Sequence, residues 1–150
     1  MAETENLDEG PDAAHRVPPG VDDATVEAVG AVTAAFEVVE HARGMLYAFH
    51  RLLGRADLEL GDALDQLEAA GHGELADRVR ADVLGRNVLD GRWTFQVVEE
   101  FDDGYHRAFA DAERAVRDEL LGGRRHVAEA QMKERRRTHG RPGHEALPPS

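Results

Sequence analysis

Residues 99–106, Glu-Glu-Phe-Asp-Asp-Gly-Tyr-His, gather four carboxylates, a tyrosine and a histidine within eight residues. Carboxylates and imidazoles bind metal ions inside helical bundles and exchange protons with substrates. The same residues also form the polar side of many helices. We expect the second arrangement, a paired polar border between two helices, for the reasons below.

On a helical wheel, Phe101 and Tyr105 point one way, whereas Asp102 and His106 follow the edge of this apolar face. An earlier helical segment carries a matching edge. An antiparallel pairing with Leu53 opposite Trp93 brings the two edges together. It places Tyr47 near Glu99, Arg43 near Asp102 and Asp103, and Glu40 near His106. We call this set the polar seam; its members are Glu40, Arg43, Tyr47, His50, Glu99, Asp102, Asp103 and His106.

A metal site in the polar seam is the alternative hypothesis. Di-metal bundles use Glu-x-x-His pairs, and here Asp103 and His106 match that spacing only with Asp in place of Glu. Arg43 would also set a positive charge against the metal. We therefore expect no metal and no cofactor, and we expect Arg43 to pair with Glu99, Asp102 or Asp103.

The composition excludes several kinds of active site. The chain has no cysteine, its one serine is Ser150 at the end, and it has no glycine-rich phosphate loop. The loop Gly-Arg-Asn-Val-Leu-Asp-Gly-Arg-Trp at residues 85–93 is the best candidate lining for a pocket. We expect no catalytic residues and a protein that is not an enzyme.

The helical periodicity predicts an all-α fold of one 150-residue chain. We expect a long helix that begins at Asp22 or Asp23 and ends at Leu53, where Gly54 stops it, and a short helix at 57–70 with Asp57 as its N-cap. We further expect a second short helix at 75–85, a second long helix at 93–121 that ends at Gly122 and Gly123, and a basic helix at 125–137. Short connections favour an antiparallel helical bundle, with the short pair between the long helices and a C-terminal helix after them. The predicted divisions are a disordered acidic arm (1–20), a bundle domain (21–123), a basic C-terminal helix (124–138) and a disordered tail (139–150).

The first long helix carries more apolar surface than one neighbour can cover. Beside its main apolar line, a second line contains Val38, Met45 and Leu52. We therefore expect this helix to be covered on two sides. The short helices reach only about half of the long pair, and we expect the last helix or a second copy of the chain to cover the other half. The same wheel predicts that His50 is buried and that His72, between two glycines, is exposed.

The net charge of −12 argues against nucleic acid as a partner, except through the basic C-terminal segment. No apolar run is long enough to predict a membrane span, so we expect a cytoplasmic protein. The sequence predicts a helical protein that acts in protein–protein interaction, beginning with self-association as a homodimer through its long helices. The alternative is a small metal- or ligand-binding bundle that uses the polar seam.

Overall fold

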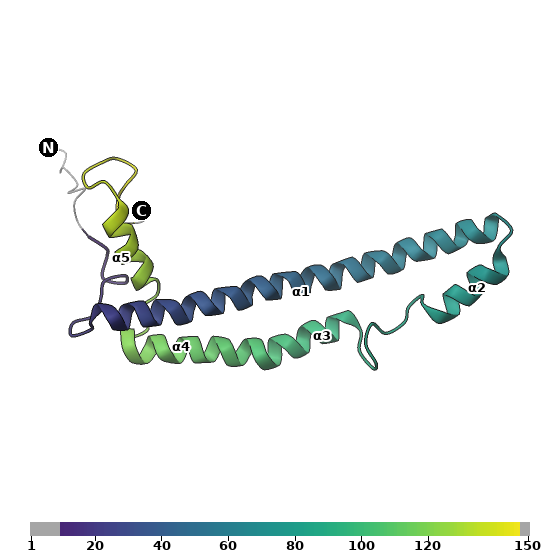
Figure 1. The fold of residues 1–150 in the computed structure, drawn as a ribbon, viewed down its shortest axis with the longest axis horizontal. Helices are drawn as coiled ribbons and strands as arrows, with labels where there is room; N and C mark the ends of the chain where they lie inside the picture. The colour runs from purple at the N-terminus through teal and green to yellow at the C-terminus, as the bar shows by residue number, and fades with distance from the viewer. Residues whose placement is uncertain (1–9, 148–150) are drawn as a thin grey trace. The chain divides into compact units, whose positions relative to one another are not determined.

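The computed structural model describes residues 10–147, and every regular element among them is helical apart from a single bridge between Leu89 and Arg92. The elements are α1 (Asp23–Ala69), α2 (Gly73–Asp82), α3 (Thr94–Phe101), the π-helical turn η1 (Asp102–His106), α4 (Arg107–Leu121) and α5 (Val127–Arg136) (Figure 1). The all-α prediction is therefore confirmed for this part of the chain.

The chain divides into two compact units. The central unit is Val38–Ala108, and the terminal unit combines the residues up to Glu37 with those from Phe109 onward. Helix α1 contributes its first turns to the terminal unit and the rest to the central unit.

The terminal unit has a small apolar core where α1, α4 and α5 meet. Its four buried side chains are Val26, Val29, Leu121 and Val127. Helix α1 begins there with a side-chain cap, because the Thr25 backbone N–H donates to Asp22 Oδ1 over 2.8 Å. Helix α4 ends at Gly122 and Gly123, whose φ angles of 60° and 79° are left-handed, as the sequence predicts.

In the central unit, α3 lies beside the middle of α1, and α2 returns alongside its last turns (Figure 1). The contacts between α1 and the 94–106 segment follow a simple order. Glu40 contacts His106, Arg43 contacts Asp102, and His50 contacts Thr94, so numbers that rise along one segment fall along the other. Arg80 of α2 reaches Asp65 and Glu68 of α1 at 2.7 and 3.2 Å.

Three predicted boundaries were wrong. Helix α1 does not stop at Leu53 but continues through Gly54 to Ala69, so the first of the two predicted short helices is part of it. Asp57, the expected N-cap of that short helix, instead accepts a hydrogen bond from the Gly85 backbone N–H at 2.8 Å. The second long helix is interrupted by the wider turn of η1, which separates α3 from α4.

The segments that we expected to be disordered are described in part. Residues 1–9 and 148–150 lie outside the described residues. Residues 10–20 instead contain a turn in which Asp12 accepts hydrogen bonds from His15 and Arg16, and Val17 packs against the core of the terminal unit. In the C-terminal tail, the Thr138 backbone N–H donates to His144 Nδ1 over 3.1 Å.

Within residues 10–147, no helix combines the length and the hydropathy that crossing a membrane requires.

Candidate functional site

The strongest interaction of the polar seam joins Arg43 of α1 to Asp102 of η1. Arg43 Nε donates to Asp102 Oδ1 at 2.6 Å and Nη2 donates to Oδ2 at 2.9 Å, which is a bidentate pair. Both side chains are about two-thirds buried, with 31% and 27% of their surfaces exposed. The Arg43 guanidinium holds the pKa of Asp102 below its usual value, and its bonds to Asp102 raise the pKa of Arg43. The expected ion pair of Arg43 is therefore present.

The other members of the polar seam separate into two groups. His106 lies against Glu40. The Arg43 guanidinium lies over the Tyr47 ring, with Arg43 Cζ 4.9 Å from the centroid of that ring. Glu99 and Asp103 do not join them. Glu99 is exposed, and Asp103 accepts a hydrogen bond from Arg107, one turn later in its own segment.

His50 is partly buried and His72 is exposed, in the predicted order. His50 Nδ1 lies 2.6 Å from the Thr94 hydroxyl, at the start of α3. Thr94 was not among the predicted site residues. Its position directly after Trp93, where the second long helix was expected to begin, is the signal that places it opposite His50.

The polar seam does not assemble a metal-binding group. In the part of the chain that the structure describes, no three His, Cys, Asp or Glu side chains are arranged to hold a metal ion. Asp102 is already engaged by a guanidinium through both of its oxygens. The chemistry that this arrangement does support is pairing of charges across two helices.

A second polar cluster lies in the terminal unit, where sequence reasoning did not look for one. Glu113 is 8% exposed. It accepts hydrogen bonds from the Thr33 hydroxyl and from Arg117 Nε, each at 3.0 Å. The hydrogen bond from Arg117 is the largest cause that lowers the pKa of Glu113, and the bond from Thr33 also lowers it. The four-residue spacing of Glu113 and Arg117 on one helix was a signal for this pair.

The basic C-terminal segment is less free to bind a partner than its sequence indicates. Arg137 is 8% exposed and donates to both carboxylate oxygens of Glu134, at 2.7 and 2.8 Å. His139 adds a third contact to Glu134 at 2.7 Å. Part of the basic charge is therefore neutralised within the chain itself.

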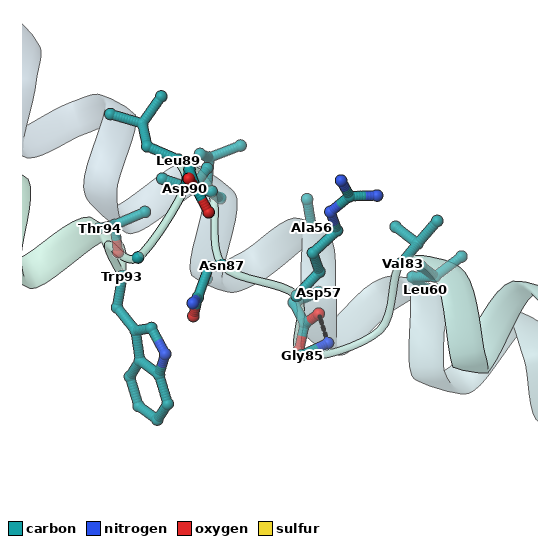
Figure 2. Close-up of a pocket in the computed structure, with 15 residues that line it drawn as sticks. Ala56, Asp57, Leu60, Val83, Gly85, Asn87, Leu89, Asp90, Trp93 and Thr94 are labelled. Carbon is teal, nitrogen blue, oxygen red and sulfur yellow. Dashed lines mark hydrogen bonds between the residues drawn. The ribbon is translucent and has the colours of Figure 1, made fainter.

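A cleft of about 1090 Å³ lies between α1 and the 83–94 loop of the central unit. Leu53, Ala56 and Leu60 of α1 form an apolar side, and Arg86 and Asn87 bring polar groups from the loop. The Asp57–Gly85 hydrogen bond ties the loop to α1, and the Trp93 side chain points away from the helix (Figure 2). Trp93 is 58% exposed. The cleft is open to solvent and has no enclosed polar centre.

An apolar surface lies on α1, on a different face of the helix from the half-buried seam residues Arg43 and His50. It is a line of six apolar side chains, and all six are exposed. Its larger members, Val38, Met45, Phe49 and Leu52, expose 68%, 62%, 45% and 60% of their surfaces. We call this surface the apolar stripe; it comprises Val38, Ala42, Met45, Phe49, Leu52 and Ala56.

The spacing of the apolar stripe is strictly four, three, four, three and four residues. That alternation is the heptad pattern with which helices form coiled-coil seams. Only Val38, Met45 and Leu52 were recognised as a second apolar line from the sequence. Ala42, Phe49 and Ala56 complete the pattern once α1 is known to be continuous through Gly54.

Comparison with known proteins assigns no role to the polar seam, the cleft or the apolar stripe. The sequence matches no protein-family model, and neither the curated proteins nor the solved structures contain a match to the chain.

Proposed function

We propose that this protein is not an enzyme and that it acts in protein–protein interaction, beginning with self-association through the apolar stripe of α1. The observation that carries the proposal is the combination of heptad spacing with exposure along one face of a single helix. A different face of the same helix segment, which carries Arg43 and His50, is already occupied by its contacts to α3 and η1.

The exposed stripe is unusual for a helix that has no partner on that side. Isolated apolar residues are common on protein surfaces, but a contiguous row of large ones marks an interaction surface. A strict heptad row further specifies the partner, because a second helix buries each member of such a row in turn. A small ligand would need a concave site, and of the six stripe residues only Ala56 lines the cleft beside the 83–94 loop.

The energies are of the size that a reversible dimer needs. Two stripes contribute eight large side chains, and burying the exposed part of each contributes about 1–2 kcal/mol. The sum, on the order of 10 kcal/mol, has to exceed an association cost of about 4–15 kcal/mol. The stripe thus supports association of moderate affinity, in which each large side chain matters.

The polar seam has a structural role in this proposal. It fixes the register of α1 against the segment that contains α3 and η1, so that the apolar stripe stays on the outer side. The descending order of the contacts supports an antiparallel bundle, to which a second copy of the chain adds its own α1. The bidentate geometry of Arg43 and Asp102 favours this role, because it defines both distance and rotation.

The proposal is tested by comparing two leucines of α1. Leu52 belongs to the apolar stripe and is 60% exposed, whereas Leu58 lies outside it and is 73% exposed. We expect Leu52→Lys to be a monomer when its mass is measured by light scattering, because a charge buried between two apolar stripes cannot be solvated. Leu58→Lys, which introduces the same charge on the same helix, should leave the dimer intact. Equal behaviour of the two variants would contradict the proposal.

A further inference from the structure

The apolar stripe contains both large and small side chains, and their order along the helix favours one direction of pairing. Val38, Met45, Phe49 and Leu52 are large, whereas Ala42 and Ala56 are small. When a second copy of this row runs in the opposite direction, centred between Met45 and Phe49, small side chains face large ones. Ala56 then faces Val38, and Ala42 faces Leu52.

We infer that two copies of α1 pair antiparallel through the apolar stripe, with a two-fold axis between Met45 and Phe49. This inference rests on the proposed self-association and adds its direction and register. Val38 then lies opposite the partner's Ala56, Ala42 opposite the partner's Leu52, and Met45 opposite the partner's Phe49. A two-fold axis makes each contact occur twice, as in most homodimers.

The packing of each layer decides between the two directions. In a parallel dimer in register, each residue would face its own copy. Phe49 would then crowd Phe49, whereas Ala42 and Ala56 would face alanine and leave space between the helices. Antiparallel pairing sets a large side chain against a small one in four of the six layers. These four layers then leave less empty space between the helices than the alanine–alanine layers of a parallel dimer would, which favours close packing.

The ends of the stripe agree with the same register. The next heptad position after Ala56 is Glu59, which is exposed and bound by Arg55 of its own helix at 2.6 Å. In the antiparallel register Glu59 lies opposite the partner's Ala35, so no second acid faces it. In a parallel dimer the Glu59 side chains of the two copies would face each other, and like charges in one layer destabilise a helix–helix interface.

The absence of cysteine allows a direct test by disulfide cross-linking of the full chain. We would prepare Val38→Cys with an affinity tag and Ala56→Cys without one, so that mixed and homogeneous cross-linked dimers differ in size. In the antiparallel register the two Val38 positions lie ~27 Å apart, because roughly 18 residues at 1.5 Å each separate Val38 from Ala56. A disulfide requires Cα atoms within about 7 Å.

The expected result is a mixed disulfide between the two variants on gentle oxidation, about tenfold more abundant than either homogeneous dimer, because only the mixed pair meets the distance limit. Arg78→Cys, on the exposed surface of α2, serves as the control and should cross-link with neither. A homogeneous Val38→Cys dimer would show parallel pairing and overturn the register. A dimer by light scattering without the mixed disulfide would overturn it as well. A monomer by light scattering would instead overturn the proposed self-association itself, so the two failures are distinguishable.

Discussion

Arg43 and Asp102 face each other across α1 and η1 with both guanidinium-to-carboxylate bonds formed, at 2.6 and 2.9 Å. The residues are far apart in sequence, and each is about two-thirds buried. A charge in such a position is tolerated only when it is paired. The pair therefore constrains how α1 meets its neighbour, and it explains why an arginine lies beside the apolar residues of this face.

Removal of Arg43 should destabilise the protein. In Arg43→Met, Asp102 remains partly buried without its partner, and we expect a loss of about 1–3 kcal/mol of unfolding free energy. The double variant Arg43→Met with Asp102→Leu removes both charges and should recover part of that loss. Urea denaturation of the unmodified protein, of Arg43→Met, of Asp102→Leu and of the double variant measures both effects. If the double variant lost as much unfolding free energy as the two single variants together, or more, the two charges would not be coupled in this way.

The Glu134 carboxylate should titrate far below a normal glutamate. The bonds from Arg137, and then from His139, lower the pKa of Glu134 from 4.5 to about 2. Because the folded pKa is depressed, this group stabilises the folded state fully above pH 4.5, and the contribution disappears as the pH falls from 4.5 to about 2. The carboxyl chemical shift of Glu134 in an NMR titration measures the midpoint.

Arg137→Met provides the control for that titration, because it removes the largest cause of the shift. The midpoint of Glu134 should then move upward toward 4.5. An unchanged midpoint would mean that Arg137 does not hold the carboxylate in solution.

Two glycines of α1 should respond in opposite ways to the same substitution. A Cβ added at Gly30 would lie 2.7 Å from the Cβ of Ala128, whereas one added at Gly44 would meet nothing within 4 Å. Gly44→Ala should therefore stabilise the protein by about 0.5–1 kcal/mol through helix propensity. Gly30→Ala should destabilise it by about 1–3 kcal/mol, because overpacking exceeds that gain. Thermal unfolding compares the two, and equal stabilisation by both would show that α5 does not approach α1 so closely.

The sequence predicted the partners of Arg43 for a physical reason. Its apolar periodicity set the face of each helix, and one assumed point of contact, Leu53 against Trp93, set the register. His50 against Thr94 lies close to that assumed point. Glu99 and Asp103 were included because a helical wheel cannot resolve neighbours that differ by one residue, and η1 further changes the rotation per residue.

The continuity of α1 was missed because Gly54 was interpreted as a helix end. A glycine costs about 1 kcal/mol in a helix, which its neighbours can offset. Many helices end at a residue in the left-handed conformation, and at the end of α1 this residue is Gly71, with φ of 93°. Asp57 resembled an N-cap, but its carboxylate holds the loop at Gly85. Such a contact between distant segments leaves no local signal in the sequence.

Sedimentation equilibrium of the unmodified chain over a range of concentrations tests the central claim most directly. One copy has a mass of 16.5 kDa. Self-association through the apolar stripe predicts an average mass that rises with concentration toward twice that value, and that stays at 16.5 kDa in Met45→Glu. A mass of 16.5 kDa for the unmodified chain at every concentration would contradict the account.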